Sequence, residues 1–204
     1  MASAEPRQPS RRYRGTPHEE RRAQRREQLL RAAVRVYGER GYRNATVKAV
    51  CEAAGLTERY FYESFPNSEA LLAAAYEAVV RILLRDLRAA GEGAAGSAED
   101  KVRAILAAYY TALRDDPQSA RLFLVEVAGV SPAVDEAFAA SLKAFGAQIA
   151  ETLGNPAPDA LLRDGVAGGV IHVALGWIGS GYAAPVETVV QAAARLCLLL
   201  RPQA

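Results

Sequence analysis

The sequence is poor in the residues that build metal sites and many catalytic sites. Its 204 residues include two cysteines, Cys51 and Cys197, and two histidines, His18 and His172. A zinc site needs three or four such ligands close together, so we expect no metal site. Both cysteines lie on apolar segments far apart, which predicts buried free thiols in a reducing cytoplasm. The chain also lacks a Glu-x-x-His spacing, so we expect neither an enzyme nor a cofactor.

Long apolar runs are scarce as well. The first 28 residues contain none, so we expect no signal peptide. Residues 165–186 form an uncharged stretch of 22 residues, which is long enough to cross a bilayer. Six of them are glycine, and His172, Ser180 and Pro185 interrupt the rest. A transmembrane helix and a closely packed buried helix both remain open here. We favour the buried helix, and expect a cytoplasmic protein without a membrane partner.

Positive charge is concentrated in the N-terminal part of the chain. Residues 1–65 carry 14 basic and 8 acidic side chains, whereas residues 66–204 carry 11 and 15. A basic front suggests contact with a polyanion, although a solvated basic tail gives the same pattern. Residues 1–15 are rich in proline, arginine and serine, and are expected to be a disordered arm.

Helical spacing recurs throughout the chain, and no segment shows the alternation of a strand. Thr16 is a candidate cap of a first helix that ends near Gly41. Thr46 caps a short helix that Gly55 ends, and Thr57 caps another. Residues 67 to about 90 form a long helix, and residues 89–100 form a loop. Further helices are predicted at about 98–115, 117–129, 132–153, 159–182 and 186–201.

The two short helices and the glycine turn between them have the pattern of a helix-turn-helix. Phe61 and Phe65 are four residues apart and should point inward. The outer face of the second helix then presents Glu58, Arg59, Tyr60 and Tyr62 to the major groove of DNA. An ordinary helical hairpin with solvated charges is the alternative.

At this point the sequence resembles a family. "RREQLLRAAVRVYGERGYRNATVKAVCEAAGLTERYFYESFPNSEALL" is similar to the N-terminal domain of TetR-type transcriptional regulators. The resemblance implies an all-α chain of about nine helices. It places a helix-turn-helix DNA-binding domain at residues 16–66, after the arm at 1–15. A helical domain for effector binding and dimerisation follows at 67–204.

The resemblance also implies roles for individual residues. Thr46 and Lys48 match positions that meet the DNA backbone, and Thr57 and Tyr62 match phosphate contacts. Glu58, Arg59 and Tyr60 match positions that face bases. Arg59 can hydrogen-bond both acceptors of a guanine, and Glu58 can accept from a cytosine amine.

Two serines depart from the family's pattern. Ser64 and Ser68 stand where the family usually has histidine and lysine, and each can still give one hydrogen bond to a phosphate. The lost lysine charge should lower the salt dependence by about one unit of slope. The arginines of the arm could compensate by entering the minor groove, namely Arg7, Arg11, Arg12 and Arg14.

For the second domain the resemblance implies an effector pocket and a dimer. The last two helices would form the interface, unless they are buried within one subunit. Aromatic and polar residues of the middle helices are candidate pocket residues, although each aromatic could simply belong to the core. They are Tyr109, Tyr110, Phe123, Glu126, Phe138, Phe145, His172 and Trp177. Glu126 stands alone in an apolar segment, so it needs either a polar ligand or an arginine from a neighbouring helix.

The predicted function is a dimeric repressor that leaves a palindromic operator in double-stranded DNA when a small apolar effector binds. A helical small-molecule-binding or scaffold protein that has lost DNA binding is the alternative.

Overall fold

The computed structural model describes residues 17–127 and 129–202, and every regular element in that part of the chain is helical. The predicted all-α fold is therefore confirmed. The arm, with Arg7, Arg11, Arg12 and Arg14, and the cap residue Thr16 lie outside the described residues. The helices are α1 (Pro17–Arg40), α2 (Val47–Ala54), α3 (Glu58–Ser64), α4 (Ser68–Gly93), α5 (Ala98–Asp115), α6 (Pro117–Arg121), α7 (Pro132–Thr152), α8 (Ala160–Gly179) and α9 (Val186–Cys197). Shorter 3-10 turns span Tyr42–Asn44 and Leu198–Leu200, and a π-helical turn spans Leu122–Glu126.

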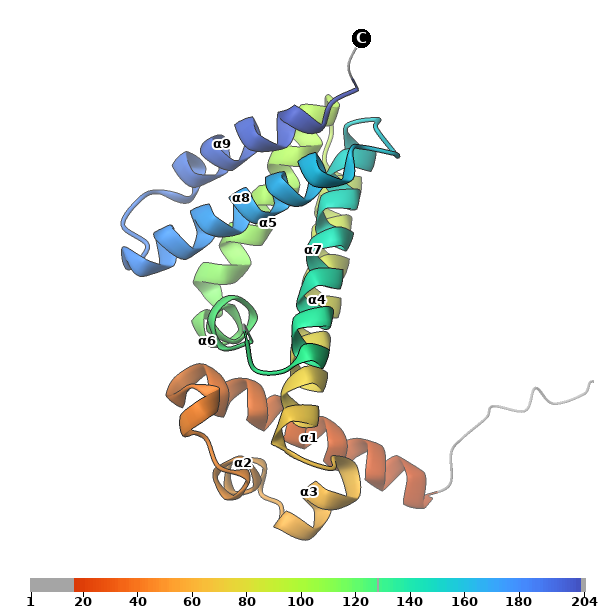
Figure 1. Cartoon of the computed structure of the whole chain (residues 1–204), viewed down its shortest axis with the longest axis vertical. Helices are drawn as coiled ribbons and strands as arrows, with labels where there is room; N and C mark the ends of the chain where they lie inside the picture. Colours follow the sequence, from red (N-terminus) through yellow and green to blue (C-terminus); the bar gives the residue numbers. More distant parts are fainter. Residues whose placement is uncertain (1–16, 128, 203–204) are drawn as a thin grey trace, which may run out of the picture.

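The helices form a small unit and a larger bundle (Figure 1). α1, α2 and α3 gather at one end of the molecule, and α4 leads from them into the bundle beside α7. α8 and α9 lie together at the other end, and α6 sits above α1 where the two parts meet. The long helix α4 is therefore the covalent connection between the small unit and the bundle.

Local sequence explains the small unit. Thr46 Oγ1 accepts a hydrogen bond from the Ala49 N–H at 3.1 Å, as expected for the cap of α2. Gly55 ends α2 with φ of 67°, a left-handed conformation that glycine adopts without strain. Thr57 has the extended backbone of a cap, but its side chain makes no capping hydrogen bond. Phe61 and Phe65 are both buried against α1, as their spacing predicts.

Two predicted boundaries are wrong. Residues 89–93 belong to α4 and not to a loop, and Gly91 is buried where α4 meets α5. A Cβ on Gly91 would lie 2.9 Å from Ile105, so this glycine permits close packing of two helices. The predicted helix at 117–129 divides into α6 and the π-helical turn.

α8 is packed on one side only. It is the one described helix that is long and apolar enough to span a membrane by length and composition. Its buried face carries Val166, Val170, Ala174 and Trp177, and the Val170 carbonyl accepts a hydrogen bond from Tyr110 at 3.0 Å. Most of the uncharged stretch is thus a bundle helix, but the expected closely packed burial holds for one face only, because the opposite face is exposed.

Candidate nucleic-acid interface and effector cavity

The three neighbouring aromatic residues of α3 point in different directions. Phe61 is fully buried, whereas Tyr62 is 58% exposed and packs edge-on against it at 5.1 Å between ring centroids. Tyr60 is half-buried, and the Arg25 guanidinium lies 4.4 Å from its ring centroid. Tyr62 is therefore open to a partner as predicted, but one ring face of Tyr60 is already covered by α1.

Arg59 is the most open side chain of the predicted reading face. Its side chain is 84% exposed, and its Nε donates to Glu63 Oε1 at 3.1 Å. A guanidinium held through Nε keeps its two terminal nitrogens free, and these are the donors that can pair with two acceptors of a guanine. Glu58, the first residue of α3, is also exposed.

Sequence reasoning missed the arginines of α1. Arg22 donates to the Glu63 carbonyl at 3.2 Å, and Arg25 lies 3.9 Å from the Glu63 carboxylate. Arg26 lies over the Phe65 ring at 4.6 Å. The signal was present in "RRAQRR", where basic residues three and four apart share one helix face. α1 thus places a row of positive charge beside α3.

The remaining predicted contacts lie at or near the surface, and most of their side chains have a partner within the small unit or at the start of α4. Lys48 is exposed and lies 3.9 Å from Glu52, and Thr46 and Thr57 are exposed at the starts of α2 and α3. Ser64 donates to the Tyr60 carbonyl at 2.9 Å, and Ser68 shares a hydrogen bond with the Tyr42 hydroxyl at 3.3 Å.

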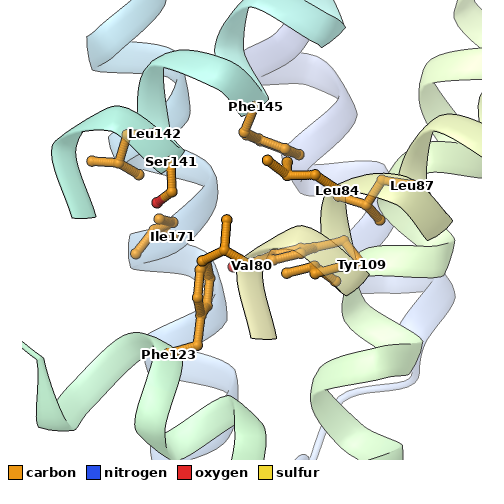
Figure 2. A pocket seen from close by; sticks show the side chains of 10 residues that line it. Val80, Leu84, Leu87, Tyr109, Phe123, Ser141, Leu142, Phe145 and Ile171 are labelled. Carbon is orange, nitrogen blue, oxygen red and sulfur yellow. The ribbon is translucent and has the colours of Figure 1, made fainter. Parts of the chain in front are cut away.

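The bundle contains a narrow cavity of about 20 Å³ (Figure 2). It lies between α4, α5, α7, α8 and the π-helical turn. Three of the predicted pocket residues line it: Tyr109, Phe123 and Phe145. Sequence reasoning missed the others, which are Val80, Leu83, Leu84, Leu87, Ser141, Leu142 and Ile171. Most of these are aliphatic residues at core-like spacing, so no local signal separates them from ordinary packing.

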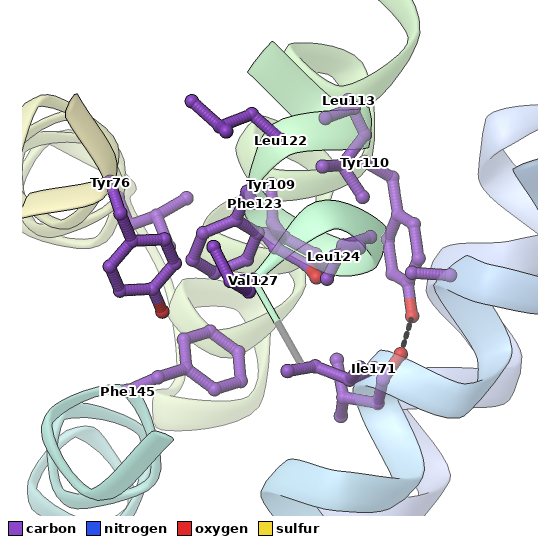
Figure 3. Close-up of a cluster of buried hydrophobic side chains, with 14 of the residues drawn as sticks. Tyr76, Tyr109, Tyr110, Leu113, Leu122, Phe123, Leu124, Val127, Phe145 and Ile171 are labelled. Atoms are coloured by element: carbon purple, nitrogen blue, oxygen red, sulfur yellow. Dashed lines mark hydrogen bonds between the residues drawn. The ribbon is translucent and has the colours of Figure 1, made fainter. Parts of the chain in front are cut away.

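The other predicted pocket residues lie outside the cavity lining. Tyr110 points toward α8 and away from the cavity (Figure 3). Trp177 donates to the Ala184 carbonyl at 2.8 Å and packs against Tyr182. Phe138 is half-buried beside Tyr76, and His172 is exposed on the outer face of α8. Helical spacing identified these as large side chains but could not say which side of each helix faces the cavity.

Only two of the residues that line the cavity carry polar side-chain atoms, Ser141 and Tyr109. The Ser141 hydroxyl donates to the Phe138 carbonyl at 2.7 Å and lies 2.6 Å from the Tyr76 hydroxyl, which therefore donates to it. The Tyr109 hydroxyl is the one buried side-chain polar atom of the described residues that has no hydrogen-bond partner. Burial raises the pKa of Tyr109 well above its usual range, so its hydroxyl remains a neutral donor.

A shallow groove adjoins the cavity. Its volume is about 200 Å³, and it shares Leu83 and Phe123 with the cavity. The rest of its lining is Val79, Ile82, Asp86, Ala108, Ala112, Leu113, Asp116, Ser119 and Ala120. Phe123 therefore separates an open, mostly apolar surface from the enclosed space.

Glu126 links the bundle to the small unit and does not line the cavity. Its Oε2 accepts from the Tyr42 backbone N–H at 2.7 Å, and its Oε1 accepts from Arg121 Nε at 3.0 Å. The expected arginine partner thus comes from one turn earlier in the same segment. Gly41 has φ of 81°, and a Cβ there would lie 3.2 Å from the Glu126 carboxylate. The side chain is only 12% exposed, so removing it would strip a nearly buried N–H of its acceptor.

α8 and α9 leave an apolar face without a partner in this subunit. Leu161 is 84% exposed on α8, and Leu199 is 58% exposed just after α9. A Cβ added to Gly165, Gly168 or Gly176 of α8 would meet nothing within 4 Å.

These features define a helix-turn-helix protein with a helical, cavity-containing second part. Residues 29–75 match the family model described as bacterial regulatory proteins, tetR family. The HTH-type transcriptional regulator RutR of Escherichia coli K12 is 27% identical over 117 residues, which are 57% of this chain and 54% of RutR. The match thus spans about half the length of that curated relative. The matched residues run from α1 into α4 and include the helix-turn-helix, so this part of the chain is similar to the tetR-family regulators.

Two solved structures share the overall fold. FadR from Bacillus subtilis, crystallised with stearoyl-CoA, superposes with a TM-score of 0.71 at 18% identity, over 84% of this chain and 96% of that one. FadR from Bacillus halodurans gives 0.73 at 21% identity, over 85% and 94%. Their similarity extends the comparison from the small unit to the bundle.

Proposed function

We propose that this protein is a homodimeric transcriptional repressor that an apolar small molecule releases from a palindromic DNA operator. One observation carries the proposal: the exposed reading helix and the apolar cavity are joined through Glu126, which holds the small unit from the cavity-lining π-helical turn. The matched regulator RutR supports the same class of function. Residues 16–66 would bind DNA, and residues 67–204 would bind the effector and the second subunit.

On the DNA side, Arg59 is proposed to read a guanine with its terminal nitrogens while Glu63 holds Nε. Glu58 would accept from a neighbouring cytosine amine, and Tyr60 would offer its remaining edge to a base. Tyr62 would bind phosphate. Further phosphate contacts on either side of the recognised bases would come from the α1 arginines and from Thr46, Lys48, Thr57, Ser64 and Ser68. Contacts in the minor groove would come from Arg11, Arg12 and Arg14.

On the dimer side, the open faces of α8 and α9 are proposed to pack against their copies around a two-fold axis. The glycines of α8 would let two backbones approach closely, and Leu161 and Leu199 would be covered. A two-fold dimer presents two reading helices to two half-sites, and their spacing must match whole turns of DNA. A palindromic operator follows from this geometry.

Coupling between the sites is proposed to run through the π-helical turn. Phe123 lines the cavity, and Glu126 follows it by three residues in the same turn. π-turns interrupt a helix and are frequent at functional sites. A ligand that displaces Phe123 would shift the carboxylate that holds the Tyr42 N–H, and so change the angle of the small unit relative to α4.

The direct test is selection of genomic DNA fragments by the purified, full-length protein. We expect enrichment of palindromic fragments, with an affinity that falls steeply as salt increases. Retention of no fragment at low salt would contradict the proposal and favour a helical ligand-binding or scaffold protein without DNA binding.

A further inference from the structure

Granting the proposed effector response, the cavity itself restricts the chemistry of the effector. We infer that the ligand is an uncharged, mostly apolar molecule with one hydrogen-bond acceptor, such as an ester or ketone, which accepts from the Tyr109 hydroxyl. The inference deepens the proposed function by naming the ligand class. It rests on the polar groups of the cavity, on the charges around it and on the position of Phe123.

Among the residues that line the cavity, the Tyr109 hydroxyl is the polar group that is free to bind a ligand. The Ser141 hydroxyl has one proton, which it donates to the Phe138 carbonyl. The Tyr76 hydroxyl donates its proton to Ser141. Tyr109 remains, fully buried and without a partner. Figure 2 shows its side chain extending from α5 toward Val80 and Phe123. Only apolar atoms face the empty space of the closed cavity, so a ligand meets the hydroxyl only when the cavity expands. A buried hydroxyl without a partner costs free energy, and a ligand acceptor that reaches it would recover that cost.

The second step is the absence of charge among the residues that line the cavity. All ten are neutral, and eight are hydrocarbon side chains. A carboxylate or an ammonium group on the ligand would lose its hydration there without gaining an ion pair. The enclosed part of the ligand must therefore be neutral.

The third step concerns the groove through which Phe123 meets solvent. No lysine or arginine is among the residues that line it, and its two charged residues are Asp86 and Asp116. Asp86 pairs with Arg85, and Asp116 caps α6 through the Ser119 N–H, so neither is a free site for a cation. Phosphate groups of a coenzyme A thioester would meet negative charge at this opening.

Binding requires the cavity to expand, because about 20 Å³ holds little more than one water molecule. Phe123 is the side chain shared with the larger groove, and it stacks on Tyr76 at 5.7 Å. Turning Phe123 aside would join the two spaces into one site from the groove to Tyr109. The same movement involves the π-helical turn that carries Glu126.

The experiment measures binding of four probes that share an unbranched eight-carbon chain: methyl octanoate, octanoate, octylamine and octanoyl-coenzyme A. Calorimetry on the full-length protein is expected to rank the neutral ester first. Tyr109→Phe should weaken binding of the ester about tenfold, the effect of losing one hydrogen bond. Tighter binding of a charged probe, or binding of none of the four, would overturn the inference.

Tyr110→Phe is the matched control, because it removes a hydroxyl from the adjacent residue that donates to Val170 and not to the cavity. It should lower the melting temperature and leave ester affinity unchanged. Tyr109→Phe should leave the melting temperature of the free protein unchanged or raise it, because its hydroxyl has no partner to lose. A drop equal to that of Tyr110→Phe would show a structural partner and contradict the inference.

Parallel DNA binding distinguishes the two proposals. If DNA is bound but the ester result does not depend on Tyr109, the ligand class is wrong while the repressor function stands. If no DNA is bound but the Tyr109-dependent ester binding is found, the ligand class stands and the repressor function fails.

Discussion

The small unit and the bundle use their side chains in opposite ways. In the unit of α1–α3, the side chains proposed to act are polar and lie at least partly at the surface, and neighbouring groups such as Glu63 hold Arg59 in place. In the bundle, the cavity is formed by hydrocarbon side chains, and its one unpaired polar atom is the Tyr109 hydroxyl. The first kind of site recognises charge and hydrogen-bond pattern, whereas the second recognises volume and the lack of charge.

The largest expected effect separates the stability of the two regions. Phe61→Ala removes a fully buried ring from the core of the small unit, and such changes cost about 3–5 kcal/mol. We expect DNA binding to be lost while the bundle stays folded. Trp177, the only tryptophan, lies in the bundle, so its fluorescence should still report a cooperative unfolding transition. Loss of that transition would show that the two regions fold as one unit.

The next effect tests the open face of α8. Gly176→Leu places a large side chain where no atom of the subunit lies within 4 Å, and it exchanges glycine for a good helix former. The subunit should remain folded but become monomeric by analytical ultracentrifugation. DNA affinity should fall on the order of a hundredfold, because the two half-sites are no longer bound together.

Gly93→Leu is its control. Gly93 is also helical, exposed and free of neighbours within 4 Å, but it lies at the end of α4. It should leave the dimer and DNA affinity intact. If the Gly176→Leu variant is still dimeric, the dimer interface does not include this face of α8.

These two regions also differ in how far the sequence predicts them. The helix-turn-helix could be predicted because capping residues and Gly55 fix its ends, and because Phe61 and Phe65 have to share one face. The partial burial of Tyr60 under Arg25 could not be predicted from the sequence, because it depends on how α1 crosses α3. The resemblance supplied the rest, since position within a known motif assigns direction as well as residue type.

In the bundle, residue type was a poor guide to position. Large aromatic residues were predicted to surround the effector, yet Tyr110 and Trp177 bind backbone carbonyls within the core. Adjacent residues on a helix point about 100° apart, and helix packing decides which of them faces the cavity. Tyr109 lines it, whereas Tyr110 donates to Val170. Glu126 was correctly expected to need a partner, but the backbone N–H of Tyr42 lies 84 residues away in the sequence and leaves no local pattern.

A smaller effect is expected for base recognition by the small unit. Arg59→Ala should cost about 1–3 kcal/mol and relax the preference at one position of each half-site. Tyr62→Phe should lower the affinity for all DNA sequences by the same factor, because a contact to phosphate does not distinguish between bases. Competition binding against a library of operator variants measures both. Unchanged preference in Arg59→Ala would show that the reading face is wrongly assigned.

Glu63→Gln refines that result. Glutamine keeps an acceptor for Arg59 Nε but removes the carboxylate charge. Arg59 should therefore still prefer the same base, but the ratio of the affinity for that base to the affinity for the other bases should fall. Glu52→Gln is the control, since Glu52 pairs with Lys48 and lies away from Arg59.

The smallest effect concerns the contact that joins the two regions. Glu126→Gln retains an oxygen for the Tyr42 N–H but loses the ion pair with Arg121, which lies at the surface. The Arg121 end of the pair is half-exposed and glutamine can still accept a hydrogen bond, so the loss of stability should be about 1 kcal/mol. The coupling between ligand and DNA should weaken by about 0.5–2 kcal/mol, because an ion pair with Arg121 no longer holds the side chain at position 126 in place.

The measurement is DNA affinity with and without a saturating ligand, compared between Glu126→Gln and wild type. Glu136→Gln on α7 is a matched control, because Glu136 is exposed and outside this contact. If ligand and DNA affinities change independently of Glu126, the connection must run through the other contacts between the two regions, which are the continuous helix α4 and the packing of α6 on α1. These helices would then couple a cavity that recognises volume to a surface that recognises charge.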